Sequence, residues 1–98
     1  MRIGKKLIER LSEKAKNINM SRNEHVNHLI KIFLNYEKEH LFGTKIPTKD
    51  FVDALSDREI MNIEIEEKVF DKLCKRAEEK NITATLYAII ALCAEANP

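Results

Sequence analysis

The chain has 98 residues, the length of one small domain, which leaves no room for a two-domain enzyme with a cleft between its domains. Its 17 basic and 16 acidic side chains, together with 44% apolar residues, are typical of a well-folded soluble chain rather than a disordered one. No apolar run approaches the roughly 20 residues of a membrane-spanning helix, and the basic N-terminus is not followed by the apolar stretch of a signal peptide. We therefore expect a cytoplasmic protein that does not contact a membrane.

The charge is unevenly distributed along the chain. Residues 1–35 contain eight basic and three acidic side chains, a net charge of +5, and the remainder contains nine basic and thirteen acidic side chains, a net charge of −4. The first third can therefore face a polyanion that the rest repels. The alternative is that these charges are solvated helix faces without a partner.

Two helices joined by a short polar turn are predicted in residues 1–36. From about residue 5 to residue 17, apolar residues recur at helical spacing, namely Leu7, Ile8, Leu11, Ala15 and Ile18. Ser21 and Glu24 form a capping box, in which the hydroxyl accepts from the backbone of residue 24 and the carboxylate returns to the backbone of residue 21. A second stripe then extends to about residue 36 through Val26, Leu29, Ile30, Phe33 and Leu34.

Residues 37–59 are interpreted as a structured connector. Gly43 and Pro47 interrupt the helical pattern, and Thr48 can cap a short helix. The apolar side of this helix is predicted to contain Phe51, Val52 and Leu55.

The second half, residues 60–98, begins with the clearest strand pattern. Apolar residues alternate over residues 61–65, as in a half-buried strand. Glu66 and Glu67 then provide the negative charge that favours a helix N-terminus. The predicted helix reaches about residue 80 through the apolar stripe Val69, Phe70, Leu73, Cys74 and Ala77.

A final helix is predicted over residues 86–96, with Thr83 or Thr85 as its cap. It is apolar almost all round, so it must be buried or form a subunit interface. Cys74 and Cys93 lie in these apolar helices without a CxxC pair, which indicates reduced core residues rather than a disulfide or a metal site.

The two halves form an internal repeat with an offset of 62 residues. This offset aligns Leu11 with Leu73, Ala15 with Ala77, Asn19 with Asn81, Met20 with Ile82, Ser21 with Thr83 and Ile30 with Leu92. Each copy contains a strand, a helix, a short turn and a capped helix. In the first copy the strand is reduced to residues 1–3, followed by Gly4 at the junction with the helix.

The runs LIERLSEKAKNINMSRNEHVNHLI and MNIEIEEKVFDKLCKRAEEKNIT give the chain its likeness to a known family. It resembles the ribbon-helix-helix transcription regulators, and with two motifs it is similar to the tandem regulators encoded by archaeal viruses, which would act in the host cytoplasm. The resemblance implies a mostly helical α+β fold, with motifs at residues 1–36 and 60–98. Because one strand with two helices cannot satisfy its strand edge, the two strands are expected to form an antiparallel ribbon over a helical core.

The resemblance also implies which side chains read DNA bases. In the family, outward-facing ribbon side chains enter the major groove. Arg2 is the outward position of the first strand and can contact guanine in bidentate fashion, and Asn62 of the second strand suits adenine. Glu64 departs from this pattern, because phosphates repel it unless it accepts from cytosine N4.

A second set of implied residues contacts phosphates. In the family, the N-terminus of the second helix presents its backbone N–H groups to a phosphate. The matching residues of the first copy, with the peripheral lysines, are Ser21, Arg22, Asn23, Lys5, Lys6 and Lys16. In the second copy Thr83, Ala84 and Thr85 lack a positive side chain. The alternative is that Ser21 is a helix cap alone and that the cations are solvated.

Neither a metal site nor a catalytic site is predicted. His25 and His28 are three residues apart, but the only further histidine is the distant His40, so we expect them to face solvent. No Ser/His/Asp or Cys/His arrangement has motif support, which argues against an enzyme and against a cofactor.

Two hypotheses follow. The first is a sequence-specific regulator of double-stranded DNA, in which the motifs pair within one chain or between chains, and in which a homodimer or higher oligomer binds repeated half-sites. The second is a protein-interaction module, antitoxin-like or an adapter, that keeps the fold without binding DNA; the near-neutral total charge and Glu64 favour it.

Overall fold

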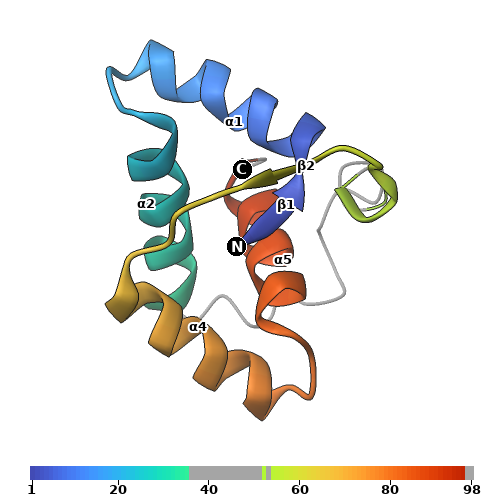
Figure 1. Ribbon diagram of the computed structural model, residues 1–98. Helices are drawn as coiled ribbons and strands as arrows, with labels where there is room; N and C mark the ends of the chain where they lie inside the picture. Colours follow the sequence, from blue (N-terminus) through green and yellow to red (C-terminus); the bar gives the residue numbers. More distant parts are fainter. Residues whose placement is uncertain (36–51, 53, 97–98) are drawn as a thin grey trace.

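The computed structural model describes residues 1–35, 52 and 54–96, and these form a mostly helical unit with one small sheet (Figure 1). Its elements are β1 (Arg2–Gly4), α1 (Lys5–Asn17), α2 (Arg22–Asn35), β2 (Ile60–Asn62), α4 (Glu67–Glu79) and α5 (Ala84–Ala96). Residues 52 and 54–56 are also helical. This α+β composition confirms the predicted fold class at that level. The predictions for Gly43, Pro47, Thr48 and Phe51 lie outside the described residues.

The predicted repeat is confirmed in the backbone. Both ends of α1 recur in α4 after 62 residues. Each helix ends at an asparagine in the left-handed conformation, Asn19 with φ 55° and Asn81 with φ 57°. The N–H two residues beyond the helix cap returns to the last turn in both copies, from Met20 to the Ala15 carbonyl at 2.9 Å and, in the second copy, across the equivalent pair at 3.0 Å. Both turns are therefore Schellman motifs with asparagine in place of glycine.

The caps of α2 and α5 also match. The Ser21 hydroxyl accepts from the Glu24 N–H at 3.2 Å, and the Thr83 hydroxyl accepts from the Leu86 N–H at 3.1 Å. Of the two predicted caps for the last helix, Thr83 is therefore the one used. The Glu24 carboxylate accepts from the Ser21 hydroxyl at 3.1 Å, which differs from the predicted contact with the backbone of residue 21.

The two strands pair antiparallel within one chain. Arg2 lies opposite Asn62, residue 3 opposite residue 61, and residue 4 opposite residue 60. The ladder ends one pair further on, where Met1 and Ile63 exchange N–H···O bonds of 2.8 and 2.7 Å. Because side chains alternate across a strand, residues 3 and 63 face the helices and are buried, while Arg2 and Asn62 face outward.

The predicted strand over residues 61–65 is too long. The observed strand ends at Asn62, and the backbone beyond the last strand pair is bonded by a side chain of α2 instead. The Asn27 amide donates to the Glu64 carbonyl at 3.0 Å and accepts from the Glu66 N–H at 2.8 Å. This contact redirects the chain into α4, which begins at the predicted acidic pair.

The core lies between the sheet and the two capped helices. In Figure 1 α2 and α5 run side by side, and the ribbon crosses in front of them. Phe33 of α2 and Tyr87 of α5 meet edge to face, with ring centroids 5.6 Å apart. Residues 87–93 are buried in this core, which confirms the predicted burial of the last helix. The same burial means that this stretch of α5 offers no surface to another subunit.

Several apolar side chains predicted on inward faces are exposed instead. Ile18 is 53% exposed because it lies at the C-cap, beyond the last regular turn of α1. Val52 and Leu55 are 51% and 53% exposed, since their helical segment is buried through Ala54. Phe70 is 42% exposed because residues 69, 73 and 77 are the ones that face the core.

Candidate nucleic-acid interface

The two residues predicted to read bases lie together on the outer face of the ribbon. Arg2 and Asn62 are directly opposed across the strands, and both are exposed. Opposed residues of an antiparallel pair have Cβ atoms about 4.5–5.5 Å apart and share one face of the sheet. The structure thus brings a guanidinium and a carboxamide, from positions 60 residues apart, to one exposed place.

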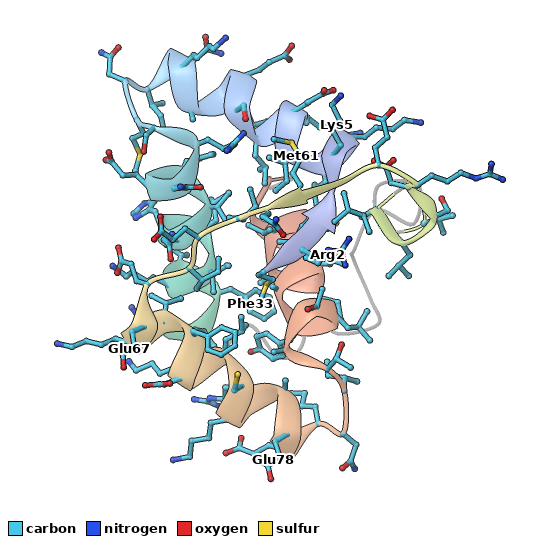
Figure 2. The ribbon with its side chains drawn as sticks, in the orientation of Figure 1. Arg2, Lys5, Phe33, Met61, Glu67 and Glu78 are labelled. Carbon is cyan, nitrogen blue, oxygen red and sulfur yellow. The ribbon has the colours of Figure 1, made fainter. Side chains whose placement is uncertain are left out.

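The other end of the outer ribbon face is covered. A Cβ atom added at Gly4 would lie 2.9 Å from the Ala54 carbonyl oxygen and 3.0 Å from the Asp57 Cβ. Gly4 therefore permits the segment before β2 to pack directly on the strand. In Figure 2 Arg2 extends from β1 on the side where this helical segment lies. The accessible part of the ribbon is therefore the end formed by Arg2 and Asn62.

Asp57 holds this segment against the first turn of α1. Its Oδ2 accepts from the Lys6 backbone N–H at 2.8 Å, and its Oδ1 accepts from the Glu59 N–H at 3.1 Å. The bond from Lys6 is the main reason why the pKa of Asp57 lies below its ordinary value. Gly4, the N-cap residue of α1, has no side chain to cap the helix, so a carboxylate 51 positions along the chain from Lys6 takes this role.

Lys5, a predicted phosphate contact, is already engaged by carboxylates. Its ammonium lies 3.0 Å from Glu59 and 3.7 Å from Glu9. The hydrogen bond to Glu59 is the main cause that raises the pKa of Lys5 above its ordinary value. A phosphate would have to displace these groups to bind Lys5, whereas the neighbouring Lys6 side chain is exposed.

The six predicted phosphate contacts lie at two places. Lys5 and Lys6 are at the start of α1, beside the ribbon, and Lys16 is near its end, about 17 Å along the helix axis from Lys5. Lys16 therefore belongs with the turn that leads to Ser21 and Arg22. At this turn the buried Nε of Arg22 has no hydrogen-bond acceptor among the described residues.

Asn23 lies beside a concentration of negative charge. Its side chain lines a cavity together with the carboxylates of Glu24, Glu64, Glu66 and Glu67. Its buried Oδ1 atom has no donor among the described residues. An anion approaching Asn23 is repelled by these carboxylates, so this position is the least favourable of the predicted phosphate contacts.

Asn27 was missed by the sequence analysis. It is 4% exposed, and besides its two bonds to the segment after β2 it donates to the Asn23 carbonyl at 2.7 Å. The available signal was its position one residue after Val26, inside an apolar stripe, where a buried carboxamide requires partners. Asp57 had no comparable signal, because its partners are defined only by the tertiary fold.

The prediction that both histidines face solvent is wrong for His25. This residue is 6% exposed, and neither of its ring nitrogens has a hydrogen-bond partner among the described residues, whereas His28 is exposed. Burial is the main cause that lowers the pKa of His25 below 6.5, with smaller contributions from His28 and Lys14. Within the described ranges, no group of three or more His, Cys, Asp or Glu residues is arranged to hold a metal ion.

Comparison with protein families, with curated proteins and with solved structures finds no match for the chain. None of the helices in the described part of the chain combines the length and the apolar character needed to cross a membrane.

Proposed function

We propose that this protein is a sequence-specific regulator that binds double-stranded DNA through its two-stranded ribbon. The observation that supports it most is the cross-strand pair of Arg2 and Asn62 on the exposed end of the ribbon. A two-stranded ribbon fits the major groove, where an arginine pairs with guanine and an asparagine with adenine. The two side chains together suit adjacent base pairs of a short site.

The backbone contacts in this proposal come from both ends of α1. Lys6 lies beside the ribbon, and Lys16, Ser21 and Arg22 surround the start of α2, where backbone N–H groups favour an anion. The unpartnered Nε of Arg22 gives this end a free donor. Because one ribbon spans few base pairs, we propose that two or more molecules bind repeated half-sites.

The second candidate function is a protein-interaction module. It is favoured by three apolar side chains that are at least half exposed in or near the segment covering the ribbon, namely Val52, Leu55 and Ile60. Exposed apolar groups of this kind suit a protein interface better than a polyanion. An apolar interface is also insensitive to salt, which separates it from DNA binding.

The test is equilibrium binding to a duplex from upstream of the protein's own gene, compared with an unrelated duplex of equal length. The affinity is measured by fluorescence anisotropy at about 50 mM and about 200 mM salt, because phosphate contacts weaken steeply over this range. Arg2→Ala and Asn62→Ala are compared with Arg58→Ala, a control that removes an exposed cation outside the ribbon.

We expect Arg2→Ala to lower the preference for the first duplex by about 1–3 kcal/mol, roughly 5- to 150-fold, with a smaller effect on the unrelated duplex. Arg58→Ala should keep the wild-type preference. Equal binding of both duplexes by the wild-type protein contradicts sequence reading. Binding to neither duplex at low salt favours the interaction module.

A further inference from the structure

The second half of the chain has a net negative charge, but α4 separates its charges onto different faces. Lys68, Lys72 and Lys75 are spaced by four and three residues, so they project from one side of the helix. The acidic residues Glu67, Asp71 and Glu78 occupy the adjacent side. The net charge of −4 therefore conceals a basic surface.

This basic surface borders a groove between α4 and the last turn of α2, called here the α2–α4 groove. Two cavities share Leu34, Asn35 and Lys72, and together they are lined by five cations: Lys31, Lys68, Lys72, Lys75 and Arg76. Two carboxylates oppose them, Glu79 in the lining and Glu66, which lies 2.8 Å from the Lys31 ammonium. The difference of five and two gives the groove a charge of about +3.

The cations on α4 are available to a ligand. Lys68, Lys72 and Lys75 are exposed, and none of them has a carboxylate within ion-pair distance among the described residues. The floor of the groove is apolar, but Leu34 is only 6% and Val69 only 3% exposed. A protein partner would gain little from burying so small an area, so the binding energy of this groove is mainly electrostatic.

We propose that the α2–α4 groove binds the phosphate backbone of a second DNA duplex. The line of cations from Lys68 to Lys75 extends about 10 Å along α4, and each phosphate that it neutralises releases a condensed counterion. In Figure 2 Arg2 and Glu67, the first residue of α4, lie on opposite sides of the ribbon. A duplex on the ribbon and a duplex in the groove therefore occupy different sides of one molecule, which bridges them.

Because this inference rests on the proposed function for its first duplex, the two are tested with separate variants. An immobilised duplex is loaded with protein, and the capture of a second, fluorescent duplex of the same sequence is measured. The groove variant is Lys72→Ala with Lys75→Ala, since alanine preserves the helix. The control, Lys14→Ala with Lys80→Ala, removes the same charge elsewhere, and circular dichroism verifies that both fold.

We expect the groove variant to capture at least about 10-fold less of the second duplex. The slope of log K against log salt should fall by about 2, because each phosphate that is no longer neutralised lowers it by about 0.9. The control should keep the wild-type capture. If the ribbon does not read DNA, the groove still gives unselective binding that Arg2→Ala leaves intact and the groove variant removes.

Three results would overturn the inference: a wild-type protein that captures no second duplex, a groove variant that captures as much as the wild type, or a control that loses as much as the groove variant. Competition by polyglutamate without any binding of duplex would assign the groove to an acidic protein partner instead.

Discussion

The carboxamide of Asn27 joins α2 to the segment between β2 and α4, and removing it should destabilise the whole fold. Two of its hydrogen bonds join these elements, to Glu64 at 3.0 Å and to Glu66 at 2.8 Å, and the residue is only 4% exposed. A hydrogen bond contributes a net of about 0.5–1.5 kcal/mol, so we expect Asn27→Ala to lower the free energy of unfolding by about 1–3 kcal/mol. For a chain of this size, each kcal/mol lowers Tm by about 4–8 °C.

The measurement is urea unfolding followed by far-ultraviolet circular dichroism, since the chain has no tryptophan. Asn27→Leu fills a similar volume without the hydrogen bonds, so it separates the effect of the bonds from that of packing. Asn35→Ala, at the exposed end of the same helix, is the control and should unfold with the wild type. An Asn27→Ala midpoint equal to the wild type would refute the role of this carboxamide.

Three other predictions concern the turns, the buried histidine and the covered strand. Asn19→Ala and Asn81→Ala should each lower stability by about 1 kcal/mol in urea unfolding, because alanine is strained at positive φ; equal stability would argue against the Schellman turns. The pKa of His25 is lowered in the folded state, so the unfolded state binds more protons as the pH falls below about 6.5, and stability should decrease between pH 7 and pH 5. His25→Leu should remove most of this pH dependence, and a wild-type stability that is constant over this range would contradict the burial. Gly4→Ala places a methyl group 2.9 Å from the Ala54 carbonyl and should cost about 1–3 kcal/mol on thermal unfolding, whereas an unchanged Tm would mean that this segment does not pack on the strand.

The helices were predictable because their signals are local. The spacing of Leu7, Leu11 and Ala15 indicated the bounds of α1, and the offset of 62 carried the same pattern to α4. The hydroxyl residues at 21 and 83 marked where the second helices begin. These features depend on contacts within a few residues, so periodicity and capping chemistry are enough to find them.

The errors occur where tertiary contacts decide the outcome. The alternation that predicted a strand through Ile65 was real, but the ladder ends at Ile63 and Asn27 binds the backbone beyond it. Phe70 fits the helical stripe of α4, yet residues 69, 73 and 77 fill the available core. Neither a missing strand partner nor the width of a core is encoded in local spacing.

The candidate site was predictable only in part for the same reason. Alternation along each strand indicated that Arg2 and Asn62 face outward, and the register places them opposite each other. The same reasoning gave no sign that Asp57 caps α1 or that Glu59 binds Lys5, because each contact joins residues more than 50 positions apart. The charge count by segment was also misleading, since it placed the basic surface of α4 in an acidic half.

The central claim is that the ribbon reads DNA sequence, and selection from a pool of random duplexes tests it most directly. We expect the wild-type protein at physiological salt to enrich a short motif containing guanine and adenine on one strand, in line with Arg2 and Asn62. The double variant Arg2→Ala with Asn62→Ala should retain salt-sensitive binding without enriching that motif. If the double variant enriches the same motif as the wild type, or if the wild type enriches none, the ribbon does not read DNA.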